Sequence, residues 1–180
     1  MIYLFLAEGF EEIEAFTQAD LLRRAGLDVK CVSVESYPVI SGAHKIKVMA
    51  DCTISEITVS ADDMILLPGG MPGVENLYAC KELTALIKSH YDEGGRIAAI
   101  CAAPIILGRL GILAGKMATC YPGFEDELQG AKYFNCPVVV DGEIITAKAA
   151  GAAIELSAEI ISLLAGESEA DKVLSDIYYE

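Results

Sequence analysis

The segment RIAAICAAPIILGRL, residues 96–110, places a cysteine at the junction of two different patterns. Residues 96–100 form a short and mostly apolar run, which is typical of a parallel strand buried on both faces. Residues 103–110 follow with a helical pattern. The alanines around Cys101 suit a sharp turn whose backbone lies close to neighbouring chain segments, as in the nucleophile elbow of G-x-S-x-G enzymes. The segment therefore predicts a strand, a tight turn that presents Cys101, and a helix.

Short apolar runs and helical patterns alternate in the same way along the rest of the chain. Strands are expected at residues 2–6, 29–34, 44–50 and 64–67, and residues 138–146 (VVVDGEIIT) predict a hairpin that turns at Asp141-Gly142. Helices are expected at residues 11–25, 81–93, 151–165 and 168–178. The alternation predicts one α/β domain over residues 1–180, with a doubly wound, mostly parallel sheet and helices on both faces. In such folds the sites lie at the carboxyl ends of the strands.

Composition excludes several classes of protein. With 53% hydrophobic residues in a chain of 180, disorder is excluded. A net charge of −14 argues against a nucleic-acid binder, because such proteins carry basic stripes. The longest apolar run, residues 97–107, is shorter than the roughly 20 residues that a spanning helix needs. The N-terminus lacks the basic start of a secretory signal, so we expect a cytoplasmic protein that binds no membrane.

The six cysteines form no C-x-x-C pair and have no histidine at zinc-ligand spacing, so no metal site is expected. Only Cys101 has a context that indicates chemistry. Its position before a helix favours the thiolate and a lowered pKa. From this segment alone, a buried cysteine that fills space is an equally good interpretation.

Two further features complete a candidate site. The segment LPGGMPG, residues 67–73, follows a predicted strand, and the N–H groups of Gly69 and Gly70 are expected to form an oxyanion hole with that of Ala102. By itself this segment indicates no more than a turn. Glu14 falls on the apolar face of the first predicted helix, where an unpaired carboxylate is costly. Two charges about 4 Å apart repel by roughly 4 kcal/mol at an effective dielectric near 20, so we expect a protonated Glu14 that donates a hydrogen bond to the Cys101 thiolate.

These residues carry a resemblance to a known family. The chain resembles the ThiJ/PfpI superfamily, and within it the DJ-one (Parkinson disease protein) subfamily. The matching stretches are LAEGFEEIEA (6–15), LLRRAG (21–26), LPGG (67–70), AAICAAP (98–104) and DGEIITAKAAGAAIELSAEII (141–161). The resemblance implies a flavodoxin-like sandwich that forms a homodimer and needs no cofactor. It implies Cys101 as the reactive cysteine, Glu14 as its protonated partner, and Gly69, Gly70 and Ala102 as the anion-binding amides.

The chain also departs from the family pattern. The subfamily often has a histidine before a proline near the cysteine, whereas this chain has Tyr121 before Pro122. Neither His44 nor His90 is expected near Cys101, so no Cys–His pair is predicted. Tyr121, and with it Cys120, is a candidate for the pocket. Ala102 after the cysteine, where the protease branch has histidine, argues against a peptidase.

The resulting hypotheses share one site. The first is an enzyme of glyoxalase or deglycase type, in which the Cys101 thiolate adds to a small reactive carbonyl compound and Glu14 moves protons. The second is a non-enzymatic oxidative-stress sensor or chaperone that acts through oxidation of Cys101 by an oxidant. A third, thiazole monophosphate biosynthesis, comes from the family name alone, and no phosphate loop supports it.

Overall fold

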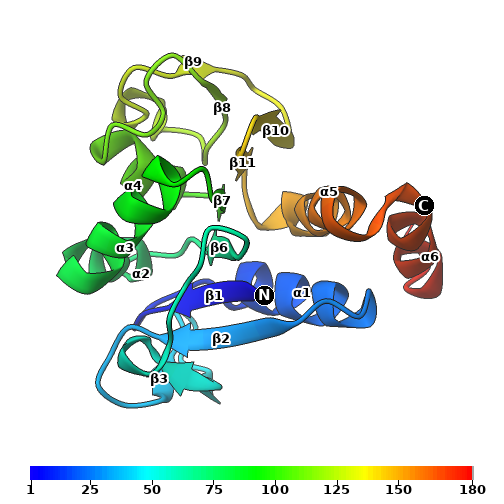
Figure 1. The fold of residues 1–180 in the computed structure, drawn as a ribbon, viewed down its shortest axis with the longest axis horizontal. Coiled ribbons are helices and arrows are strands. Elements are labelled where there is room, and N and C mark those ends of the chain that lie inside the picture. Colours follow the sequence, from blue (N-terminus) through cyan, green and yellow to red (C-terminus); the bar gives the residue numbers. More distant parts are fainter. Residues whose placement is uncertain (180) are drawn as a thin grey trace.

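A seven-stranded sheet forms the centre of the computed structural model, which describes residues 1–179 (Figure 1). Its strands, in spatial order, are β10 (Val138–Asp141), β11 (Ile144–Ala147), β7 (Arg96–Ile100), β6 (Met64–Leu67), β1 (Ile2–Leu6), β2 (Val29–Ser33) and β5 (Cys52–Thr53). Neighbouring strands are parallel except β10, which pairs antiparallel with β11. The predicted α/β fold with a mostly parallel sheet is therefore confirmed.

Two small sheets lie outside this central one. The first pairs β3 (Val39–Ser41) with β4 (Lys47–Met49), and the second pairs β8 (Met117–Ala118) with β9 (Lys132–Tyr133). Short 3-10 helices occur at η1 (Ile54–Glu56), η2 (Glu125–Glu127) and η3 (Ala150–Ala152). The β3–β4 hairpin and the segment from β8 to β9 border the candidate site described below.

Helices cover both faces of the sheet, as the fold class requires (Figure 1). One face carries α1 (Glu12–Arg24), α5 (Ala153–Ala165) and α6 (Glu167–Asp176), and the other carries α2 (Gly73–Ala79), α3 (Lys81–Asp92) and α4 (Pro104–Arg109). The apolar sides of α5 are packed against α1 and α6 of the same chain. Among residues 1–179, no helix combines the length and apolar character that crossing a membrane requires.

The two cores follow from the alternation of side chains along a strand. In β1 the side chains of Ile2, Leu4 and Leu6 belong to the core beneath α1 and α5. Tyr3 and Phe5 belong to the core beneath α3 and α4. All five β1 residues are buried. A continuous apolar run in the sequence is thus a strand that has helices on both of its faces.

The structure corrects three details of the sequence-based expectations. Residues 44–50 were expected as one strand at an edge of the sheet, but only Lys47–Met49 is extended, and it pairs with β3 outside the central sheet. The 138–146 hairpin turns at Gly142-Glu143, one residue later than expected, because Asp141 still pairs with Ile144. Helix α2 was not predicted, since its seven residues are too few to show a helical period.

Gly108 lets helix α4 approach the loop that follows it in sequence. A Cβ at this position would collide with the backbone oxygen of Glu127, and it would lie 3.0 Å from the nitrogen of Gln129. These backbone atoms cannot rotate away as a flexible side chain can. The absence of a side chain at Gly108 therefore determines how closely residues 127–129 pack on α4.

Replacing Gly108 by alanine tests this contact. Helix propensity alone predicts a gain of about 1 kcal/mol, whereas overpacking costs about 1–3 kcal/mol. We expect overpacking to dominate, so urea denaturation should show that Gly108→Ala lowers the free energy of unfolding by about 1–2 kcal/mol. Gly151→Ala is the matched control, because no atom lies within 4 Å of a Cβ there. A Gly108→Ala protein as stable as the Gly151→Ala protein would contradict this account of the packing.

Candidate functional site

Three segments that are distant in sequence meet at the carboxyl ends of neighbouring strands. Glu14 lies in the first turn of α1, which follows β1, while Gly69 follows β6 and Cys101 follows β7. The spatial order β7-β6-β1-β2 reverses direction between β6 and β1. A reversal of this kind opens a crevice in doubly wound sheets, and the three residues lie beside it.

The backbone of Cys101 has an uncommon conformation that neighbouring segments hold in place. Its φ is +65°, in the left-handed region that residues with a Cβ rarely adopt. Its N–H donates to the carbonyl of Ala147 at 2.9 Å, and its carbonyl accepts from the N–H of Tyr121 at 2.7 Å. Helix α4 begins three residues later, at Pro104. This strained turn leaves the Cys101 side chain half-buried at the end of β7, as is common for a functional residue.

The carboxyl group of Glu14 faces the sulfur from α1. Glu14 is only 1% exposed, and its Oε2 accepts a hydrogen bond from the N–H of Gly69 at 2.7 Å. It also shares a hydrogen bond with the Cys101 side chain. Burial raises the pKa of Glu14 to about 7, although the hydrogen bonds from Cys101 and Gly69 act in the opposite direction. The position expected for Glu14 on the buried face of the helix, and the direction of its pKa shift, agree with the sequence analysis.

The pKa of Cys101 shifts in the direction opposite to the sequence-based expectation. Burial and the nearby carboxyl of Glu14 raise the pKa of the Cys101 thiol, and the N–H groups of Ala102 and Gly70 only partly offset this. The expectation of a lowered pKa rested on a helix start directly at the sulfur, but α4 begins farther along the chain. The expected pair of a protonated Glu14 and a Cys101 thiolate is therefore reversed, because Glu14 loses its proton at a lower pH than the thiol does.

The backbone N–H groups of Gly69 and Gly70, which follow β6, have different partners. Gly69 was expected to offer its N–H to an oxyanion, but this N–H already binds Glu14. A Cβ at Gly69 would lie 2.6 Å from Oε2 of Glu14 and 3.1 Å from Sγ of Cys101, so only glycine fits between them. The N–H groups of Gly70 and Ala102 instead contact the sulfur. Of the three expected anion-binding amides, these two face the reacting atom.

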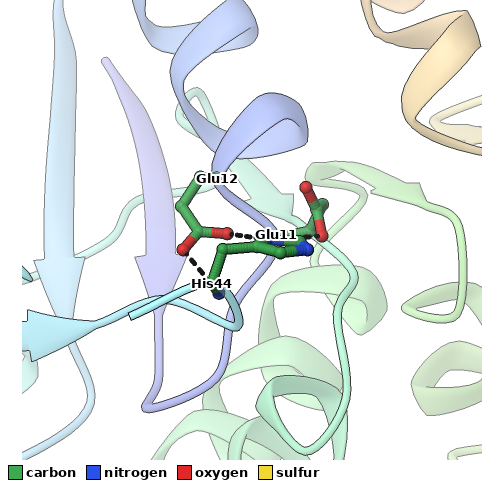
Figure 2. Close-up of side chains that lie close together, drawn as sticks. All are labelled: Glu11, Glu12 and His44. Atoms are coloured by element: carbon green, nitrogen blue, oxygen red, sulfur yellow. Dashed lines mark hydrogen bonds and ion pairs between the residues drawn. The ribbon is translucent and has the colours of Figure 1, made fainter. Parts of the chain in front are cut away.

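A small polar cluster borders the site where the β3–β4 hairpin meets the start of α1. Figure 2 shows Glu11, Glu12 and His44, whose ligand atoms lie within 4.8 Å of one another and form the one such group in residues 1–179 that could hold a metal ion. Both oxygens of Glu12 already have partners: Oε1 accepts from the backbone N–H of His44 and Oε2 pairs with its Nδ1, each at 2.8 Å. The hydrogen bonds with Glu12 raise the pKa of His44, and the ring lies 3.7 Å from Glu11. The cluster fastens the hairpin to the helix that carries Glu14.

Of the other residues considered in the sequence analysis, only Tyr121 lies beside Cys101. Tyr121 lines a hollow beside Cys101, whereas Cys120 is fully buried in the core beneath α3 and α4 and does not line this hollow. His90 lies at the opposite end of β7, where its Nε2–H donates to the carbonyl of Arg96 at 3.1 Å. Sequence reasoning did not select Met71 or Phe124, which also line the hollow, although Met71 lies within the LPGGMPG segment.

Comparisons of the sequence and of the structure with known proteins all indicate the same family. The model described as the DJ-1/PfpI family matches residues 1–163. Protein DJ-1 homolog A of Arabidopsis thaliana is 42% identical over 173 residues, which are 94% of this chain but only 44% of that protein. The chain therefore spans less than half the length of this relative.

Other relatives match over nearly their whole length. The glutathione-independent glyoxalase DJR-1.2 of Caenorhabditis elegans is 32% identical, with 98% of this chain and 94% of that protein covered. A deglycase of Pyrococcus abyssi is 29% identical over 91% of this chain and 98% of that protein. The solved structure of Toxoplasma gondii DJ-1 in an oxidised form matches with a TM-score of 0.93 and 35% identity, covering 99% of this chain and 97% of that one.

The raised pKa of Glu14 predicts a pH-dependent stability with a definite sign. A carboxyl group that ionises near pH 7 in the folded chain and near pH 4.5 in the unfolded chain favours folding only while it is protonated. Its contribution is complete below about pH 4.5 and disappears as the pH rises through 7, a difference of about 3 kcal/mol.

Glu14→Gln removes this titration and stays neutral at every pH. Urea denaturation at pH 4.5 and at pH 8 should show that the variant gains about 3 kcal/mol relative to wild type between the two pH values. Parallel stability curves for the two proteins would show that Glu14 ionises normally.

Proposed function

The chain belongs to the DJ-1/PfpI family, and from this premise we propose that it is a cysteine-dependent enzyme that acts on small reactive aldehydes. The observation that carries the proposal is the buried pair of Glu14 and Cys101, with the N–H groups of Gly70 and Ala102 directed at the sulfur. Relatives named as a glyoxalase and as a deglycase support the same substrate class. Which of these two activities the chain has is part of the proposal.

The proton shared by the pair gives each residue a role in the first step. Near pH 7 about half of the Glu14 side chains are carboxylates, each facing a protonated thiol. The carboxylate accepts the thiol proton while the sulfur forms a bond to the aldehyde carbon. The aldehyde oxygen becomes an oxyanion beside the amides of Gly70 and Ala102. It then takes up the proton that Glu14 accepted from the thiol, which gives a hemithioacetal and restores the Glu14 carboxylate. Glu14 thereby serves as a general base in place of a histidine.

The second step completes a glyoxalase reaction without an external oxidant. Glu14 removes the hydrogen of the former aldehyde carbon as a proton, which gives an enediol, and returns a proton to the adjacent carbonyl carbon. The hydroxyl proton of the hemithioacetal passes to the oxygen of that neighbouring carbon. The aldehyde carbon is oxidised to a thioester while its neighbour is reduced to an alcohol. Water then hydrolyses the thioester, which releases a hydroxy acid and restores the thiol of Cys101. For methylglyoxal the sum is one aldehyde and one water converted to one lactate.

A second function, as an oxidative-stress sensor or chaperone, uses the same sulfur. Oxidation by two molecules of peroxide adds two oxygens to the Cys101 sulfur and releases two waters. The N–H groups of Gly70 and Ala102 already contact this atom, and a protonated Glu14 offers one further donor to a sulfinate. These three donors are the observation that favours this candidate. The family's oxidised relative from Toxoplasma gondii is in line with it.

The state of assembly and the location remain parts of the proposal. A homodimer and a cytoplasmic location are implied by the family resemblance. In the hairpin, Val39 and Met49 pair with each other, and their side chains are 43% and 75% exposed. An exposed apolar pair of this kind is suited to a contact between two copies of the chain.

The enzyme proposal predicts that the wild-type protein produces lactate from methylglyoxal and that Cys101→Ser does not. Cys136→Ser should keep the full rate, because Cys136 is exposed and lies outside the site. The value of kcat/KM should rise with pH through about 7, as the Glu14 carboxylate forms, and Glu14→Gln should lose both this inflection and at least about 100-fold of the rate. Equal lactate production by wild type and Cys101→Ser would end the proposal.

The sensor function predicts selective oxidation. After mild peroxide treatment, mass spectrometry should find two added oxygens on Cys101 while Cys136 shows no such stable product. The donors at Cys101 stabilise a sulfinate, and the exposed position of Cys136 does not supply them. Accumulation of the same product at both cysteines would remove the support for this function.

A further inference from the structure

The hollow beside Cys101 is almost entirely apolar. Its volume is about 160 Å³, and it is lined by Gly70, Met71, Cys101, Ala102, Tyr121 and Phe124. None of these residues carries a formal charge at neutral pH, because the raised pKa of Cys101 keeps its thiol protonated. A bound carbonyl compound would place its reacting carbon at the sulfur and its substituent in this hollow. The substituent therefore meets carbon surface and no cation.

Two aromatic rings form the wall of this hollow. Tyr121 and Phe124 stack edge to face, with centroids 6.4 Å apart and planes inclined at 62°. The pair is held by its backbone, because Tyr121 donates to the carbonyl of Cys101 and Phe124 donates to that of Tyr121. The Tyr121 side chain is nevertheless 46% exposed, as is Met71. Apolar surface that stays exposed beside a nucleophile is surface that a ligand can cover.

The charges around the hollow are unfavourable for an anion. The Glu14 carboxyl lies beside the sulfur, and Glu125 lies close enough to raise the pKa of Cys120, after the larger effect of burial. The guanidinium of Arg109 is engaged by Glu75 and by Glu127. The whole chain carries a net charge of −14. A carboxylate or phosphate on the substrate would thus enter a negative field without a partner.

We propose that the site selects neutral aldehydes whose carbonyl bears a flat apolar group such as an aryl ring, and that Tyr121 and Phe124 determine this specificity. The inference rests on the proposed function for its chemistry, and on the shape and charge of the hollow for its selectivity. An aryl ring meets the edge and face of the two side chains in the geometry that aromatic pairs prefer. Phenylglyoxal, a neutral α-oxoaldehyde, is the substrate of this class that we expect to be favoured over methylglyoxal and glyoxylate.

Alkylation of Cys101 tests the hollow without requiring turnover. Three reagents alkylate sulfur by the same displacement of iodide from a CH2 group but differ in the substituent that this group carries. Iodoacetamide is small and neutral, iodoacetate is an anion, and N-benzyl-iodoacetamide carries a neutral aryl ring. The exposed Cys136 on the same chain is the internal reference, and peptide mass spectrometry reports both rates in one sample. Relative to Cys136, we expect Cys101 to favour the benzyl reagent over iodoacetamide by roughly tenfold and to disfavour iodoacetate.

Variants at the wall identify the residue that is responsible. Tyr121→Ala should remove most of the benzyl preference at Cys101, whereas Tyr121→Phe should retain it because the ring remains. Tyr37→Ala is the matched control, since Tyr37 is 48% exposed and does not line the hollow. A benzyl preference that is equal at Cys101 and Cys136, or one that survives Tyr121→Ala, would overturn the inference. So would a Cys101 that no reagent modifies, because the hollow would then give no access to the sulfur.

Turnover with aldehydes separates this inference from the proposed function. If both hold, the ratio of kcat/KM for phenylglyoxal to that for methylglyoxal should fall roughly tenfold in Tyr121→Ala. If aldehydes are turned over with no aryl preference, the inference is wrong and the enzyme proposal stands. A benzyl preference in alkylation without turnover of any aldehyde would refute the enzyme proposal while supporting an aryl-selective hollow at Cys101.

Discussion

The hydrogen bond between Glu14 and Cys101 joins two segments that are far apart in the sequence. One group is carried by the helix after β1 and the other by the turn after β7, and β6 lies between these strands. Because Glu14 is buried and Cys101 is half-buried, two negative charges so close together would be poorly solvated. The structure must therefore retain a proton there at neutral pH. Burial is thus the main cause of the raised pKa of both residues, and the Glu14 carboxyl raises that of Cys101 further.

The segment after β6 makes this arrangement geometrically possible. Gly69 occupies the narrow space between the carboxyl group and the sulfur, where any side chain would displace one of them. Its N–H fixes the carboxyl group, and the N–H of the next residue, Gly70, reaches the sulfur. On the other side, the Glu12–His44 contacts fasten the start of α1 to the β3–β4 hairpin. Four segments thus hold the site in place: the turn after β7, the loop after β6, the start of α1 and the β3–β4 hairpin.

Glu14, and not a histidine, is the group beside Cys101 that can accept its proton. His44 lies at the hairpin contact and His90 at the far end of β7, so neither can activate the thiol. A carboxyl group with a pKa near 7 is well matched to proton transfer at neutral pH. Tyr121 then contributes through its apolar ring, which forms a wall of the hollow next to the sulfur. The position that the family often gives to a histidine thus carries an aromatic ring that lines the hollow in this chain.

The sequence by itself determined the features that depend on neighbouring residues. The continuous apolar runs of β1, β6 and β7 identify strands with helices on both faces, and the helical spacing places Glu14 on the buried side of α1. The turn at Cys101 follows from the small residues around it, and the family resemblance added the roles of the site residues.

Only the tertiary structure decided the features that depend on contacts between distant segments. It showed that the N–H of Gly69 is used by Glu14, that Cys120 is buried, and that Phe124 reaches the hollow. It also reversed the expected direction of the Cys101 pKa, because the desolvation of the sulfur arises from segments that pack around it after folding. Strand and helix periodicity is a property of local backbone geometry. Burial, hydrogen-bond partners and pKa values arise from segments that lie tens of residues apart, and no local pattern specifies them.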